Sequence, residues 1–367
     1  MASNNSTLVL ITGATGHIGF RVLTHALNAG YAVRAAVRSQ SKANGLLTHP
    51  TIQRLNPGAR LSFAIVPDLA APHAYDEAVQ GVHYIIHIAS PLMSTRDVPL
   101  NQHAAYFIEP AVRGTLGMLD AASQSGTVRR VVITSSIAAL IPVSQLNGRE
   151  RQHRPAKASD RVPFAAAPYE SEFAAYAASK VAALAEAERW VREHEPEFDV
   201  VHLHPSFVEG RNELALSARE ALKGTNALIL GIALGKRFDS IASATVHLED
   251  VARVHVQALL PHVSGNRSYV LSQSTRWDAV RGIVARLFPE AVEKRVLPNC
   301  GNADTHEVAI DVEETEAVFG FRHAGLEEQV KSVVGHYLEL RAQSRASLRP
   351  GRERGQGAMG RQVRANA

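Results

Sequence analysis

The first 205 residues alternate short apolar runs with amphipathic stretches, and this alternation limits the possible folds more than any other feature of the chain. The apolar runs have the length and the β-branched composition of strands; those predicted are Leu8–Thr12, Ala32–Val37, Leu61–Val66, Tyr84–Ile88, Arg130–Thr134 and Val200–His204. Because they are apolar almost throughout, we expect both faces of the sheet to be buried. Helical patterns lie between them, as at Ile18–Asn28, Ile108–Gln124 and Glu172–Glu193. The pattern predicts an α/β fold with a Rossmann-type, doubly wound parallel sheet.

The pattern changes after Pro205. The later elements are shorter and no longer alternate regularly; we predict helices at Glu213–Leu230, Glu249–Leu260, Trp277–Leu287 and Leu326–Leu340, and strands around Ile241–Val246 and Ser268–Leu271. We therefore divide the chain into a first domain at residues 1–205 and a smaller α+β region at residues 206–340, beside the carboxyl edge of the sheet.

The positive charge of the chain is concentrated at its C-terminal end. The 367 residues carry a net charge of +4, yet residues 341–367 hold seven arginines against one glutamate, a local charge of +6. Residues 1–340 therefore carry −2, so the basicity does not indicate that the folded part binds nucleic acid. The tail has almost no apolar residues, and we expect residues 341–367 to be a disordered, basic appendage without a motif for reading DNA or RNA.

Several classes of protein are disfavoured by what the sequence lacks. The single cysteine, Cys300, cannot form an internal disulfide. No apolar run approaches the roughly 18 residues of a membrane span, and the polar N-terminus lacks the pattern of a signal peptide. His202 and His204 are two residues apart, but no carboxylate or cysteine cluster accompanies them at metal-ligand spacing. We expect a cytoplasmic protein with no bound metal and no membrane attachment.

Three glycines separate the first predicted strand from the first predicted helix. Gly13, Gly16 and Gly19 form a G-x-x-G-x-x-G pattern. Gly13 suits a tight turn, Gly16 lets the backbone approach a pyrophosphate, and Gly19 lets the helix pack closely against the sheet. The amides at the start of that helix then face the phosphates. The pattern predicts a dinucleotide-binding turn.

The end of the second predicted strand indicates which dinucleotide binds. NAD-binding proteins usually carry an acid there for the ribose 2′-hydroxyl, whereas a nearby arginine accommodates the 2′-phosphate of NADP. This stretch contains no acid; Arg38 ends the strand, and Lys42 follows closely. We therefore expect NADP(H).

Two short stretches of the sequence carry hydroxyl and amine side chains that could together form a catalytic site. Tyr176 and Lys180 are four residues apart in a helical pattern and so lie on one helix face. An ammonium group near a phenol favours the phenolate, so we expect Lys180 to lower the Tyr176 pKa. Ser135 and Ser136 follow a predicted central strand at the edge where ligands of such sheets bind. A serine hydroxyl there can donate to a carbonyl oxygen that gains negative charge.

Together these motifs resemble the extended short-chain dehydrogenases/reductases of the NAD-dependent epimerase/dehydratase superfamily, and within it the dihydroflavonol-reductase/cinnamoyl-CoA-reductase-like branch. The resemblance covers roughly residues 7–340. It rests on residues 12–19, 33–38, 68–69, 87–91, 110–115, 134–136, 204–210 and 246–252, together with Tyr176 and Lys180.

The resemblance implies specific roles for the matching residues. Ser136 polarises the substrate carbonyl, Tyr176 donates the proton, and Lys180 holds the nicotinamide ribose. Cofactor contacts are implied for the turn residues Gly13, Thr15, Gly16, His17, Ile18 and Gly19, for Arg38 at the 2′-phosphate, for Asp68 and Leu69 beside the adenine, for Ala89 and Ser90 in the groove, and for Pro205 at the nicotinamide.

The chain departs from the resembled branch in two places. His204 stands where an asparagine often precedes the proline, which affects positioning near the nicotinamide. The polar, basic stretch at residues 148–154 lies in a loop longer than that of the plant enzymes. We interpret this loop as solvated surface and do not transfer plant-type substrates to this chain.

These observations favour an NADPH-dependent reductase that converts a ketone or aldehyde to an alcohol, within secondary metabolism. Residues 1–205 would then be the NADP-binding domain and residues 206–340 the substrate-binding region. An NAD-dependent enzyme of the epimerase/dehydratase type is an alternative, disfavoured by Arg38. A non-catalytic, NADP-sensing interaction protein is another, disfavoured by the presence of both Tyr176 and Lys180. The expected partner is a small carbonyl compound; the sequence does not indicate an oligomeric state.

Overall fold

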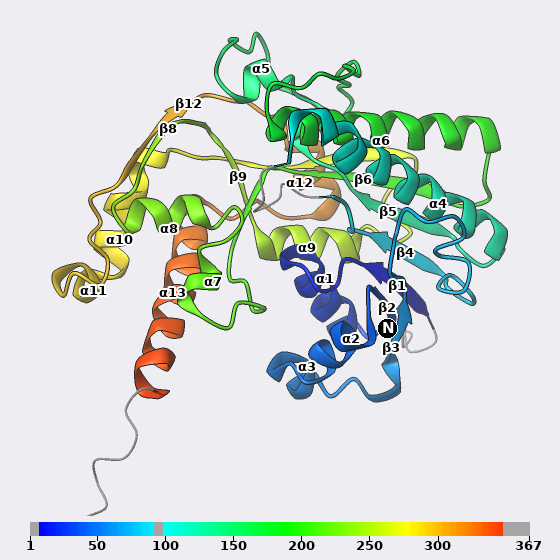
Figure 1. The fold of residues 1–367 in the computed structure, drawn as a ribbon, viewed down its shortest axis with the longest axis horizontal. Coiled ribbons are helices and arrows are strands. Elements are labelled where there is room, and N and C mark those ends of the chain that lie inside the picture. The colour runs from blue at the N-terminus through cyan, green and yellow to red at the C-terminus, as the bar shows by residue number, and fades with distance from the viewer. Residues whose placement is uncertain (1–6, 92–97, 348–367) are drawn as a thin grey trace, which may run out of the picture.

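A computed structural model describes residues 7–91 and 98–347 of the chain. Its centre is a seven-stranded, all-parallel sheet in the order β3-β2-β1-β4-β5-β6-β10 (Figure 1). The strands are β1 (Leu8–Thr12), β2 (Ala32–Val37), β3 (Leu61–Ile65), β4 (Tyr84–His87), β5 (Arg130–Thr134), β6 (Asp199–Pro205) and β10 (Arg267–Leu271). The order reverses between β1 and β4, and ligands of doubly wound sheets bind at such a crevice.

Helices cover both faces of this sheet. On one face α4 (Glu109–Ser125) packs against α6 (Glu172–His194), and on the other α1 (His17–Asn28) packs against α9 (Leu248–Gln257). The helices α2 (Gln40–Leu47) and α3 (Pro50–Leu55) lie on the α1 side. Within β1, Val9 and Ile11 enter the core beneath α1, whereas Leu10 enters the core beneath α4 and α6. The predicted Rossmann-type fold with two buried faces is confirmed.

The remaining elements form a smaller region beside the sheet (Figure 1). It contains a three-stranded sheet in the order β11-β9-β7 and a two-stranded sheet of β12 and β8. The strands are β7 (Phe207–Glu209), β8 (Arg237–Ala242), β9 (Ala244–His247), β11 (Gln273–Ser274) and β12 (Asn302–His306). The helices outside the Rossmann layers are α5 (Val143–Leu146), α7 (Ala218–Ala221), α8 (Ala227–Ala233), α10 (Val280–Leu287), α11 (Pro289–Glu293) and α13 (Leu326–Ser347). The helix α12 (Glu313–Phe319) instead packs on β10, with Phe319 in the core on the α1 side of the sheet.

The predicted helix at Glu213–Leu230 is wrong, because the chain turns twice within it. Ser217 caps the short helix α7, and Gly224 then takes a left-handed conformation with φ of +68°. The Asn226 side chain bonds both the amide and the carbonyl of Gly210, at 3.0 and 2.7 Å. This tie fixes the start of α8 to the end of β7, so the chain cannot continue as one helix.

The boundary at residue 205 does not separate the sheet from the rest. The strand β10 pairs in parallel with β6, and α9 covers the face on which α1 lies, although both elements come from beyond residue 205.

At the C-terminal end, α13 runs to Ser347, so the predicted tail begins inside a helix. Arg341 donates to the Val296 carbonyl and stacks near the Tyr337 ring. Residues 348–367 of the predicted tail lie outside the described residues.

Candidate active site

The glycine turn between β1 and α1 forms a close-packed cradle at the crevice. Gly13 has φ of +75°, and a side-chain carbon added there would lie 3.0 Å from the Ala89 amide nitrogen. A carbon added to Gly19 would lie only 2.0 Å from the Gly13 carbonyl oxygen. The Gly16 amide donates to the same oxygen at 2.9 Å, and Gly16 caps α1 without a side chain. The cradle fits a dinucleotide phosphate, which needs close backbone approach and a helix start.

The Thr12 hydroxyl, to which the sequence analysis assigns no role, joins the two strands that flank the crevice. Its Oγ1 accepts from the amides of Ile88 and Ala89, both at 3.0 Å. This fixes the segment after β4, where Ala89 and Ser90 lie, against the glycine turn. The only sequence signal for this role of Thr12 is its position, because it is a hydroxyl residue at the end of a predicted strand, directly before the glycine turn.

The remaining residues of the glycine turn, His17, Thr15 and Ile18, differ in their burial and in their contacts. The His17 ring bonds the Gly210 carbonyl through Nε2 at 3.1 Å, and burial lowers its pKa to about 4. His17 therefore ties α1 to the end of β7 as a neutral side chain. Thr15 is half-buried, and Ile18 packs against the core on the α1 side.

The residues expected around the adenosine lie after β2 and β3, which are neighbours in the sheet. Arg38 directly follows β2, is exposed, and makes no hydrogen bond or ion pair with any described residue. Asp68 accepts from the Ala70 amide at 2.9 Å. Leu69 packs on Gly114 of α4, where an added side-chain carbon would lie 2.5 Å from the Leu69 Cδ1 atom. The guanidinium of Arg38 is thus available to a ligand.

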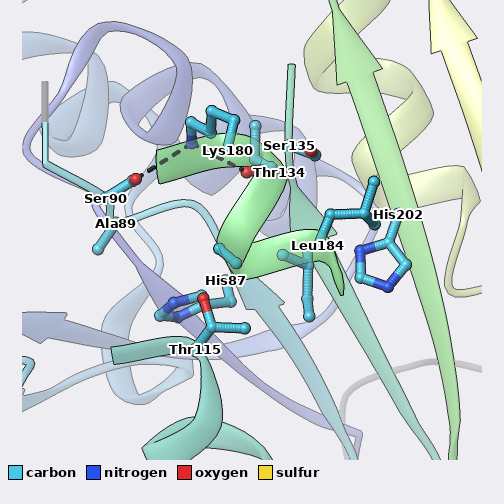
Figure 2. A pocket seen from close by; sticks show the side chains of 11 residues that line it. His87, Ala89, Ser90, Thr115, Thr134, Ser135, Lys180, Leu184 and His202 are labelled. Atoms are coloured by element: carbon cyan, nitrogen blue, oxygen red, sulfur yellow. Dashed lines mark hydrogen bonds between the residues drawn. The ribbon is translucent and has the colours of Figure 1, made fainter. Parts of the chain in front are cut away.

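The structure brings Ser136, Tyr176 and Lys180 together at the carboxyl edge of the sheet. The Ser136 hydroxyl lies close enough to the Tyr176 phenol to lower the pKa of that phenol. Lys180 lies on the same face of α6 as Tyr176, with Nζ 5.7 Å from the centre of the Tyr176 ring. Its Nζ atom donates to Ser90 Oγ at 3.1 Å and to the Thr134 carbonyl at 3.5 Å, the two bonds drawn as dashed lines in Figure 2.

Local structure explains how these side chains are held. Ser171 caps α6 by accepting from the Ala174 amide, and the helix then runs unbroken past Tyr176 and Lys180. Ser136 follows β5 and caps the short 3-10 helix Ile137–Ala139, its Oγ accepting from the Ala138 amide at 3.2 Å. The Ser136 hydroxyl proton therefore remains free for a ligand or for Tyr176.

The two consecutive serines have different surroundings. Ser136 meets Tyr176, whereas Ser135 lines a cavity of about 20 Å³ beside Lys180, together with Ser90 and Thr115 (Figure 2). The Ser135 Oγ atom is buried and has no hydrogen-bond partner among the described residues. Of the pair, Ser136 is the one placed to act with Tyr176.

The pKa of Tyr176 shifts in the direction opposite to the one predicted. Burial raises it, and the hydrogen bond to Ser136 lowers it only in part. Burial also lowers the pKa of Lys180, to about 8. The Lys180 ammonium bonds Ser90 and Thr134, not the phenol, so desolvation decides the sign for Tyr176.

Pro205 and His204 end β6 next to this group. Both are buried, and His204 bonds the backbone oxygen of Ser136.

Among residues 7–91 and 98–347, no cluster of three or more histidine, cysteine or acidic side chains is arranged to hold a metal. Over the same residues, no helix has the length and apolar character needed to cross a membrane.

Comparison with known proteins adds three findings. Residues 9–272 match the NAD dependent epimerase/dehydratase family. The ketoreductase CTB6 of Cercospora nicotianae is 43% identical over 91% of this chain and 96% of its own. The NAD-dependent epimerase/dehydratase ALT6 of Alternaria alternata is 37% identical over 90% of this chain and 97% of its own.

The fold also has solved counterparts. The NADPH complex of the yeast methylglyoxal/isovaleraldehyde reductase Gre2 superposes with a TM-score of 0.76. The match covers 92% of this chain and all of that one, at 20% identity, and so concerns the fold alone.

Proposed function

The chain belongs to the NAD dependent epimerase/dehydratase family, and from that premise we propose that it reduces a ketone or aldehyde to an alcohol with NADPH. The observation that carries the proposal is the Ser136 hydroxyl beside the Tyr176 phenol, with the Lys180 Nζ atom 5.7 Å from the centre of the Tyr176 ring. The similarity to a ketoreductase over nearly the whole chain supports it and favours a ketone of secondary metabolism as substrate.

The geometry gives each side chain a task. The cofactor, when bound, supplies a hydride to the carbonyl carbon. The Ser136 hydroxyl donates to the carbonyl oxygen, which gains negative charge as the hydride arrives. The Tyr176 phenol, kept protonated at neutral pH by burial, gives its proton to that oxygen and completes the alcohol. Lys180 is positioned by Ser90 and Thr134 to hold a ribose hydroxyl with its remaining N–H.

The test is cofactor consumption by the purified chain over a panel of ketones and aldehydes, with NADPH and NADH in parallel. We expect NADPH to be oxidised with at least one ketone, and faster than NADH. If only NADH is used, the alternative of an NAD-dependent enzyme of the epimerase/dehydratase type is favoured. If neither is oxidised with any compound, a non-catalytic role is favoured.

Replacing Arg38 by Glu is expected to reverse the preference for NADPH. The exposed guanidinium has no partner among the described residues, so its loss should not affect folding. A charge-assisted bond to the 2′-phosphate contributes enough to favour NADPH by about 10- to 100-fold. The measurement is the ratio of kcat/KM for the two cofactors. Arg54→Glu, an equal charge change on the exposed surface of α3, is the control; an Arg38→Glu ratio no different from this control would contradict the role.

The pH dependence of reduction follows from Lys180. Its pKa of about 8 means that the ammonium is present at neutral pH and is lost as the pH rises through that value. Burial keeps Tyr176 protonated over the same range. We therefore expect kcat/KM to be level through neutral pH and to fall as the pH passes about 8. A rate that stays level well above this pH would show that the ammonium is not required.

A further inference from the structure

His204 occupies a fully buried position on β6 and uses both ring nitrogens. Its Nδ1 lies 3.2 Å from the backbone oxygen of Ser136, and its Nε2 lies 3.1 Å from the Ser268 hydroxyl. Ser268 belongs to β10, the strand that pairs with β6 at the edge of the sheet. A single ring thus bridges an edge strand and the candidate catalytic serine.

The partners of His204 determine where its proton lies. A backbone carbonyl can only accept, so Nδ1 carries the hydrogen and donates to Ser136. Burial lowers the His204 pKa well below its ordinary value, so the ring is neutral and Nε2 accepts from the Ser268 hydroxyl. The Ser268 oxygen accepts in turn from an Arg161 Nη2 group at 3.0 Å. Every hydrogen bond in this series therefore has a fixed direction.

Arg161 is itself fixed to the helix that carries Tyr176 and Lys180. Its guanidinium pairs with Glu188 of α6 at 2.6 Å and also donates to the carbonyls of Ala158 and Asp160. The sequence predicts a solvated surface for the loop that contains Arg161. Its arginines at 149 and 154 are indeed exposed, but Arg161 connects it to α6 and β10.

Ser136 follows the last backbone bond that joins this segment to β6, which the Ser135 amide donates to the Leu203 carbonyl at 2.7 Å. The Ser136 backbone oxygen itself is held by the Ala139 amide at 3.0 Å, within a single 3-10 turn, and by His204. The contact with Ala139 moves with the turn, whereas the contact with His204 comes from the neighbouring strand of the sheet. His204 therefore ties the Ser136 carbonyl to the sheet directly.

We propose that His204 is a positioning residue that holds Ser136 so that its hydroxyl meets both Tyr176 and the substrate oxygen. The inference rests on the proposed function of Ser136. A displaced hydroxyl stabilises the developing charge less well, so the effect falls on kcat and leaves cofactor binding intact. His204, which stands in place of the asparagine of the resembled branch, provides an N–H donor to Ser136 at this point.

The test compares four variants in the full chain, with kcat, substrate KM, NADPH affinity and melting temperature measured for each. His204→Leu removes the donor and should lower kcat by roughly 10- to 100-fold. His204→Asn retains a donor at the Nδ1 position and should recover kcat to within about threefold of wild type. Ser268→Ala leaves the ring in place without its orienting hydroxyl and should lower kcat by roughly threefold to tenfold.

His323→Leu is the matched control. His323 is also a buried histidine, with its Nδ1 atom bonded to Glu316 Oε1 at 3.0 Å, but neither residue belongs to the candidate site. This variant should lower the melting temperature while kcat stays within about threefold of wild type. An equal loss of kcat in both leucine variants, or no recovery in His204→Asn, would overturn the inference.

Two further results distinguish a failure of the inference about His204 from a failure of the proposed function. If His204→Leu does not fold, an unchanged kcat in Ser268→Ala would still overturn the positioning role. Ser136→Ala tests the proposed function itself: if it retains full turnover, Ser136 is not catalytic, whatever the His204 variants do. If Ser136→Ala loses turnover and the His204 variants do not, only the positioning role fails.

Discussion

Tyr176→Phe is expected to lower kcat for carbonyl reduction by about 10²- to 10⁴-fold. In the proposed mechanism the phenol beside Ser136 is the proton donor, and burial keeps it protonated at neutral pH. Phenylalanine fills the same volume against Phe173, with which the Tyr176 ring is stacked, so the fold should not change. The measurement is steady-state NADPH oxidation with a ketone that the wild-type chain reduces.

The affinity for NADPH distinguishes a lost proton donor from a damaged site. Because Lys180 and Ser90 are unchanged in the variant, NADPH should bind with nearly wild-type affinity, as measured by quenching of protein fluorescence. Turnover close to wild type would show that another group supplies the proton. A matching loss of cofactor affinity would show that Tyr176 serves binding and not the chemical step.

Gly19→Ala is expected to remove most of the affinity for NADPH and to destabilise the chain by about 3 kcal/mol. The new methyl carbon would lie 2.0 Å from the Gly13 oxygen and 2.5 Å from the Gly13 carbonyl carbon. Both are backbone atoms of the cradle and cannot move aside as the end of a flexible side chain would. The helix α1 must therefore shift away from the glycine turn, which is the proposed phosphate site. Urea unfolding and NADPH titration measure the two effects.

Gly117→Ala provides the comparison for this substitution. Gly117 lies within α4, and a side-chain carbon there meets no atom within 4 Å. Alanine favours a helix over glycine, so this variant should gain about 0.5–1 kcal/mol and bind NADPH normally. If Gly19→Ala behaves in the same way, the close contact between α1 and the turn does not govern cofactor binding.

The Rossmann sheet was predictable because its strands and helices carry their signals locally. The six predicted strands and the three helices named between them agree with the structure to within one residue at each end. In a parallel sheet covered on both faces, the apolar run coincides with the strand itself. The place of β10 beside β6 was not predictable, because pairing with an edge strand depends on chain segments far apart in the sequence.

The helix prediction at Glu213–Leu230 is wrong for a related reason, because contacts outside the local sequence decide the path of the chain. The apolar spacing there suits a helix, but contacts between Asn226 and the Gly210 backbone redirect the chain. Tertiary hydrogen bonds of this kind leave no periodic signal and override local preference. The helix α13 also continues beyond its predicted end, where Arg341 finds partners on Val296 and Tyr337.

For the candidate site, the sequence predicted which side chains come together but not how deeply they are buried or what else they contact. It placed Tyr176 and Lys180 on one helix face and Ser136 at the edge of the sheet, as the structure does. It gave the wrong sign for the Tyr176 pKa, because burial depends on the packed site and not on the distance between two residues. Nor did it show that the bond from His204 to Ser136 exists.

Transfer of the cofactor hydrogen to the product tests the central claim most directly. NADPH carrying deuterium at both positions of the reactive carbon of the nicotinamide would be incubated with the chain and a ketone, and the product analysed by mass spectrometry. The proposed reaction predicts an alcohol with one deuterium on the former carbonyl carbon, and very little of it from Tyr176→Phe. An alcohol without deuterium, or labelled product formed equally by Tyr176→Phe, would contradict hydride transfer with Tyr176 as the proton donor.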